Sequence, residues 1–136
     1  MFWDASALVP CLVPEMRSQD MTALLAGGMT ITVWWATRAE CVSALERKRR
    51  DPVHPLSHYI YTMGRQRLTA ILTVADQVEP STQLQDRAIV YLEQYPLRAA
   101  DALQLAAAYV AHQPAIVCFD DRLRAAAEVE RFVVLP

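Results

Sequence analysis

Short, continuous apolar runs alternate with segments of helical periodicity along this chain, and this alternation constrains its fold more than any other feature. The apolar runs are not interrupted at every second residue, as they would be in strands with one solvated face. Continuous runs are expected for parallel strands that are covered on both faces. The predicted strands are residues 1–3, 29–34, 115–119 and 132–135.

Helices are predicted between these strands, because apolar residues recur there at helical spacing. Gly27-Gly28 follows one of them and Ser81 precedes another, which are common helix stop and start signals. Pro10 and Pro14 are expected to limit the first helix. The predicted helices are residues 6–13, 15–26, 36–50, 55–75, 81–93, 98–111 and 122–129. This order of elements predicts an α/β fold, a three-layer α/β/α sandwich with a mostly parallel central sheet.

The length and composition favour one compact unit. The chain has 136 residues without a repeat, linker or low-complexity tract, which predicts a single domain over residues 1–136. Its hydrophobic content of 54% excludes a disordered chain. No apolar run reaches the roughly 20 residues that span a bilayer, and no basic leader precedes Asp4. We therefore expect a cytoplasmic protein without a membrane partner.

The three cysteines argue against a zinc site or a disulfide framework. Cys11, Cys41 and Cys118 are widely spaced, lie in apolar settings and form no Cys-x-x-Cys pair. Buried free thiols in a reducing compartment are the simplest interpretation.

Four acidic residues stand where a predicted strand ends or within a predicted helix. Asp4 and Asp120 follow strands, and ligands of open α/β sheets gather beyond the carboxyl ends of strands. Asp101 interrupts an apolar helix, where a carboxylate without a partner is costly, and Glu40 lies in the helix 36–50. Carboxylates that share one pocket either raise their pKa values or bind a cation. Together they predict a site for a hard divalent cation such as Mg²⁺.

Each acid also has a structural interpretation. Asp4 and Asp120 can cap the helices that follow them, and Asp101 can interact with the dipole of its helix. Glu40 can pair with Arg47 or Arg38 on a solvated face. The occurrence of all four acids in this order favours the metal site.

The segments that carry these acids resemble the signatures of PIN-domain ribonucleases. Residues 1–8 resemble a strand followed by Asp-x-Ser, and residues 40–45 resemble a helix with Glu followed by Ser-Ala-Leu. Residues 97–106 and 119–123 are similar to the third and fourth signatures, and the resemblance extends over nearly the whole chain. The order and spacing are similar to those of the small VapC-type toxins of toxin–antitoxin pairs.

The resemblance implies a Mg²⁺- or Mn²⁺-dependent endoribonuclease that hydrolyses RNA phosphodiester bonds with a metal-activated water. It implies a homodimer that is neutralised by a VapB-type antitoxin. Asp4 and Asp101 would be the main metal ligands, and Glu40 and Asp120 would complete the acidic pocket. The hydroxyl of Ser6 would steady this pocket through a hydrogen bond.

Two residues beside the fourth acid depart from the family pattern. Cys118 stands where members usually carry Thr or Ser, and a thiol is a poor replacement for a hydroxyl donor. Asp121 adds a second, supporting acid, so that either Asp120 or Asp121 can face the pocket. The match of the following Arg122-Leu123 favours Asp120.

Other features give weaker signals. The basic run 47–50 is interpreted as a solvated helix end in preference to an RNA contact. His54 and His58 have the spacing of helical metal ligands but lack an intervening Glu, so we expect surface histidines. A phosphatase of the haloacid-dehalogenase kind is another class of enzyme with an Asp after a strand. Such phosphatases need a second Asp two residues after the first, and Ser6 at that position argues against this class. A non-catalytic PIN-fold module that binds RNA or protein is the main alternative.

Overall fold

A single parallel sheet of five strands forms the centre of the computed structural model, which describes residues 1–136. The strand order is β3-β2-β1-β4-β5, and all four pairings are parallel. The strands are β1 (Phe2–Trp3), β2 (Thr32–Trp34), β3 (Asp76–Val78), β4 (Ala115–Val117) and β5 (Val133–Leu135). The first strand of the chain therefore lies in the middle of the sheet.

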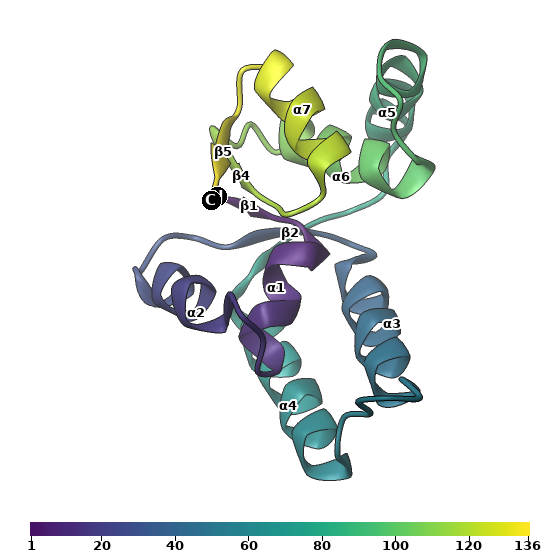
Figure 1. Ribbon diagram of the computed structural model, residues 1–136. Coiled ribbons are helices and arrows are strands. Elements are labelled where there is room, and N and C mark those ends of the chain that lie inside the picture. The colour runs from purple at the N-terminus through teal and green to yellow at the C-terminus, as the bar shows by residue number, and fades with distance from the viewer.

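Seven helices cover the two faces of the sheet (Figure 1). One face carries α1 (Ala5–Leu12), α2 (Ser18–Ala26), α3 (Thr37–Arg49) and α4 (His58–Val74). The other face carries α5 (Thr82–Gln94), α6 (Ala99–Val110) and α7 (Asp121–Val129). This arrangement confirms the predicted three-layer α/β/α sandwich.

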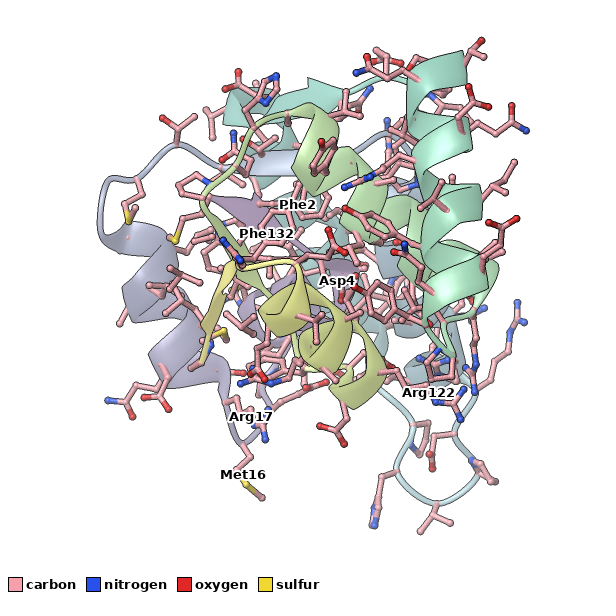
Figure 2. All side chains as sticks on the ribbon, turned by 90° about the horizontal axis from the view of Figure 1, so that it is seen from above. Phe2, Asp4, Met16, Arg17, Arg122 and Phe132 are labelled. Carbon is pink, nitrogen blue, oxygen red and sulfur yellow. The ribbon has the colours of Figure 1, made fainter.

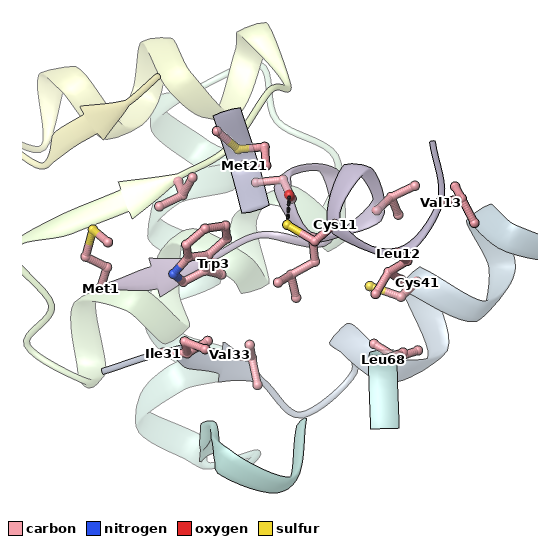
Figure 3. Close-up of a cluster of buried hydrophobic side chains, with 14 of the residues drawn as sticks. Met1, Trp3, Cys11, Leu12, Val13, Met21, Ile31, Val33, Cys41 and Leu68 are labelled. Atoms are coloured by element: carbon pink, nitrogen blue, oxygen red, sulfur yellow. Dashed lines mark hydrogen bonds between the residues drawn. The ribbon is translucent and has the colours of Figure 1, made fainter. Parts of the chain in front are cut away.

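Both faces of the inner strands are buried, which explains the continuous apolar runs. Successive side chains of a strand point to opposite faces of the sheet. Phe2 and Ile116 pack in the cluster formed with α5, α6 and α7. Trp3 and Val117 pack in the cluster formed with α1 to α4, part of which is drawn in Figure 3.

The cysteines are buried free thiols, as predicted. Cys11 on α1 and Cys41 on α3 lie in the cluster drawn in part in Figure 3, and Cys118 lies in the cluster on the opposite face of the sheet. Burial raises the pKa of Cys41 to about 12 and that of Cys118 to about 12. Thiols with such values are almost fully protonated at neutral pH, so they behave as small core residues.

The sequence does not predict β3, which is an edge strand. Asp76 and Gln77 are exposed, and the strand pairs only with β2. An edge strand of this kind needs no continuous apolar run, because it is not covered on both faces.

The predicted helices are present, but several ends differ. Pro10 lies inside α1, so the prediction that it limits the helix is wrong, and α1 ends at Leu12, ahead of Pro14. The helix predicted from residue 55 begins at His58, because the Ser57 hydroxyl caps it by accepting the N–H of Ile60 at 3.2 Å. None of the helices combines the length and hydropathy that crossing a membrane requires.

Candidate metal centre

A cavity of about 400 Å³ lies beyond the carboxyl ends of β1 and β4. Asp4 follows β1 directly, and Asp120 lies between β4 and α7. Glu40 and Asp101 come from the first turns of α3 and α6. All four acids line this one cavity, so the structure brings together side chains from distant parts of the chain. No residue of α2, β3, α4 or α5 contributes to the lining.

Asp4 is the most deeply buried of the four acids. Its residue is 8% exposed, and it lies in the interior of the molecule, whereas Met16 projects outward (Figure 2). Glu40, Asp101 and Asp120 are partly exposed. The cavity is therefore open to solvent at one side and closed at Asp4.

Three of the acids also cap helices, so capping and lining the cavity are not alternatives here. A helix N-terminus carries unpaired N–H groups and a partial positive charge, both of which favour a carboxylate. The contacts are Asp4 Oδ2 with the N–H of Ser6 (2.8 Å), Asp101 Oδ2 with the N–H of Arg98 (3.2 Å), and Asp120 Oδ1 with the N–H groups of Arg122 (3.0 Å) and Leu123 (2.9 Å).

The carboxylates repel one another and are partly withdrawn from water. Burial raises the pKa of Asp4, and the charge of Asp101 raises it further, while hydrogen bonds from Ser6 oppose the shift. Burial raises the pKa of Glu40 to about 7, with repulsion from Asp4 as the next cause. Burial also raises the pKa of Asp101, and the charge of Asp120 adds to this shift. These acids therefore form one electrostatically coupled group.

Ser6 joins the ends of the two central strands beside the cavity. Its Oγ accepts a hydrogen bond from the N–H of Phe119 at 2.9 Å, and its hydrogen bonds to Asp4 lower the pKa of that carboxyl. Cys118 does not line the cavity, because its side chain packs in the opposite cluster. The hydroxyl that stabilises the carboxyl ends of β1 and β4 is therefore that of Ser6, at the start of α1.

We expect Ser6→Ala to lower the free energy of unfolding by about 1–2 kcal/mol, because the partly buried N–H of Phe119 loses its acceptor. Urea denaturation of the two proteins measures the difference. Ser43→Ala is the matched control, since Ser43 is exposed on α3. Equal effects of the two substitutions would contradict the role of the Ser6 hydroxyl.

Gln104 is a cavity residue that the sequence interpretation missed. It lies one turn after Asp101 on α6 and is 1% exposed. Its Nε2 donates a hydrogen bond to Glu40 Oε2, and its buried Oε1 has no hydrogen-bond partner. The available signal was a polar side chain three residues after Asp101 in an otherwise apolar helix, which places both on one face.

The basic run at the end of α3 divides between two environments. Arg47 and Lys48 line the cavity, and Lys48 forms an ion pair there with Glu15, another lining residue that was not predicted. Arg49 and Arg50 pair instead with a glutamate of their own helix at 2.8 and 3.4 Å. Arg47, Arg49 and Arg50 are exposed and Lys48 is partly exposed, in agreement with the interpretation as a solvated helix end, although the first two residues of the run also border the cavity.

The other sequence candidates lie outside the cavity. Asp121 is exposed and lines a separate hollow with Tyr95 and Pro96. His54 and His58 are exposed, in agreement with their interpretation as surface histidines.

The chemistry of the lining fits a hard divalent cation. The lining offers carboxylate, hydroxyl and amide oxygens but no His or Cys. In the present side-chain positions, no three His, Cys, Asp or Glu groups stand close enough to hold an ion between them. Mg²⁺ commonly takes one or two carboxylates directly and keeps several waters, so it does not require three such groups. Asp4 is the most deeply buried of the carboxylates in this lining.

Comparisons with known proteins agree with this fold. A toxin–antitoxin complex from Klebsiella pneumoniae has a chain with a TM-score of 0.69 and 16% identity, covering 99% of this chain and 95% of that one. VapC20 of Mycobacterium tuberculosis, described as a toxin that cleaves the sarcin–ricin loop, gives 0.70 and 17%, covering 92% and 93%. A Pyrobaculum aerophilum protein gives 0.71 and 18%, covering 98% and 81%.

The sequence comparisons identify the family. No curated protein matches the sequence. The model of the PIN domain, however, matches residues 1–129, which include all four acid-bearing segments. The solved structures share the same fold. This chain therefore belongs to the PIN-domain family.

Proposed function

We propose that this protein is a divalent-metal-dependent endoribonuclease and the toxin of a type II toxin–antitoxin pair. The observation that carries the proposal is the convergence of Asp4, Glu40, Asp101 and Asp120 on one cavity at the carboxyl edge of the sheet. Membership of the PIN-domain family supports it. The descriptions of similar structures as an RNA-loop-cleaving toxin and as a toxin–antitoxin complex support RNA as the substrate and toxicity as the biological role.

Each acid is assigned a part in this reaction. Asp4 and Asp101 would hold Mg²⁺ or Mn²⁺, while Asp120 and Glu40 complete its negative surroundings. A cation held there would supply Lewis-acid stabilisation of the phosphodiester and would lower the pKa of water. Glu40 Oε1 is available to orient the attacking water, because Gln104 holds Oε2. Ser6 keeps Asp4 in place through its hydrogen bonds.

Two cationic side chains in the lining of the cavity support RNA as the substrate, because they can bind its phosphates. Arg47 and Lys48 lie in the lining on the same helix as Glu40. A phosphate of the substrate can replace Glu15 as the partner of Lys48, because both are anionic oxygen acceptors. Binding through these cations would be weakened by salt, as for any contact with a nucleic-acid backbone.

The same acidic cavity suits inhibition by a basic partner. We propose that a VapB-type antitoxin places an Arg or Lys among the carboxylates, which would occupy the metal position. We also propose a homodimer that acts in the cytoplasm. An antitoxin whose inhibition survives loss of every basic residue of its tail would contradict this mode of inhibition.

Incubation of the purified protein with total RNA, followed by mapping of new 5′ ends, tests the proposed function. We expect discrete new ends with Mg²⁺ or Mn²⁺ and none with EDTA. A parallel preparation of Asp101→Asn excludes a contaminating nuclease. Absence of metal-dependent ends, together with absence of Mg²⁺ and Mn²⁺ binding in calorimetry, would favour a non-catalytic binding module.

A further inference from the structure

Gln104 is an unusual residue for its place on α6. The residue is 1% exposed, and its neighbours on the buried side of the helix, Leu105 and Ala108, are fully buried apolar residues. Burial of an amide costs free energy unless its polar atoms are hydrogen-bonded. An apolar side chain would fill this position at lower cost, so the amide needs a reason for being there.

One half of the amide is used by Glu40. The Gln104 Nε2 donates to Glu40 Oε2, linking α6 to α3 across the cavity. A carboxylate only accepts hydrogen bonds, and an amide oxygen also only accepts. When a bound cation keeps Glu40 ionised, this pairing fixes which end of the amide is nitrogen and leaves Oε1 as the free atom.

The other half of the amide has no partner in the protein. Oε1 of Gln104 is buried and accepts no hydrogen bond, although the residue lines the cavity. The cationic donors of the lining, Arg47 and Lys48, stand near the end of α3, and Lys48 is already paired with Glu15. A water or ligand that enters the cavity beside Asp101 can supply the missing donor.

We propose that Gln104 is a positioning residue, which holds Glu40 through Nε2 and accepts a hydrogen bond at Oε1 from the water shell of the divalent cation. This inference rests on the proposed function, since it takes a cation held by Asp4 and Asp101 as given. Mg²⁺ and Mn²⁺ carry waters that donate strongly, and groups outside the direct ligands orient such sites. The single amide thereby ties the position of Glu40 to the presence of the cation.

Calorimetric titration with Mn²⁺ tests the proposal without depending on activity. We expect Gln104→Met, which keeps the volume but removes the amide, to weaken Mn²⁺ binding by about 10- to 100-fold. We also expect Gln104→Met to cleave RNA with a reduced kcat and an unchanged KM, because Glu40 loses the group that positions it.

Leu105→Met is the matched control, because Leu105 is buried on the same helix but does not line the cavity. A volume-conserving exchange there perturbs the packing of α6 to a similar extent. Equal Mn²⁺ affinity in Gln104→Met and the unsubstituted protein, or an equal loss in Leu105→Met, would overturn the inference while leaving the proposed function intact. Absence of Mn²⁺ binding by the unsubstituted protein would overturn both.

Discussion

Asp101→Asn is expected to reduce metal-dependent RNA cleavage by about 10³-fold or more, because a lost stabilisation of about 4 kcal/mol lowers a rate by that factor. Asn retains an oxygen that can cap α6 but lacks the charge that attracts a divalent cation. Initial rates on a short RNA that carries one mapped cleavage site provide the measurement. Asp4→Asn should have an effect of similar size.

The same substitution is expected to increase the stability of the metal-free protein. Burial and the charge of Asp120 raise the pKa of Asp101, which means that its ionised form is disfavoured in the folded state. An uncharged amide relieves this repulsion, and similar trade-offs between stability and activity are common at functional sites. Loss of activity with equal or higher resistance to urea would therefore exclude misfolding as the cause.

Asp121→Asn is the control for both measurements. Asp121 is adjacent to Asp120 in sequence but lines a separate hollow. It should retain full activity and metal binding. Full cleavage activity in Asp101→Asn, or an equal loss of activity in Asp121→Asn, would contradict the assignment of the cavity as the catalytic site.

Saturating Mn²⁺ is expected to raise the Tm at pH 7.5 by about 10 °C. Free ligand at 100 times its Kd adds about 2.7 kcal/mol to the free energy of unfolding, and about 3–4 °C per kcal/mol applies to a chain of this size. The gain should be smaller at pH 5, where protons compete with the cation for the carboxylates. Calorimetric scans at both pH values, with and without Mn²⁺, measure it.

Without metal, the stability should fall as the pH rises from about 4.5 to 7. Glu40 keeps its proton in the folded state up to about pH 7 but ionises near its ordinary value of 4.5 in the unfolded chain. The folded state therefore binds more protons in this interval, so that raising the pH favours unfolding. Asp4 and Asp101 are shifted in the same direction. A metal-free protein that becomes steadily more stable over this interval would contradict the coupled group of acids.

The parts of the fold that follow from local chemistry could be predicted from the sequence. Phe2 and Trp3 are both buried on opposite faces, so an uninterrupted apolar run marks a central strand. Asp76 and Gln77 form an exposed edge, and no local pattern distinguishes such a strand from a loop. At Pro10 a local rule gives the wrong answer. Proline is expected at a helix end, but Pro10 lies inside α1, whose packing in the core stabilises the helix in spite of it.

The residues of the candidate site likewise divide into those that local sequence patterns identify and those whose role depends on contacts in the folded molecule. Asp4, Asp101 and Asp120 could be found because each stands at a strand end or a helix start, where local rules place a functional carboxylate. The sequence marks Gln104 only as a polar residue in an apolar helix, because its significance depends on Glu40, which lies 64 residues away on another helix. Glu15 was missed for the same reason, since its partner Lys48 approaches it only in the folded molecule.

The walls of the cavity come only from residues 4–48 and 100–120, and the long stretch between them supplies none. Within this stretch, residues 51–57 form a largely solvent-exposed connection between α3 and α4. A peptide tag or a fluorescent label inserted there would leave every carboxylate where it is. Relatives of this chain can likewise lengthen this connection or change its charge without displacing the residues that line the cavity.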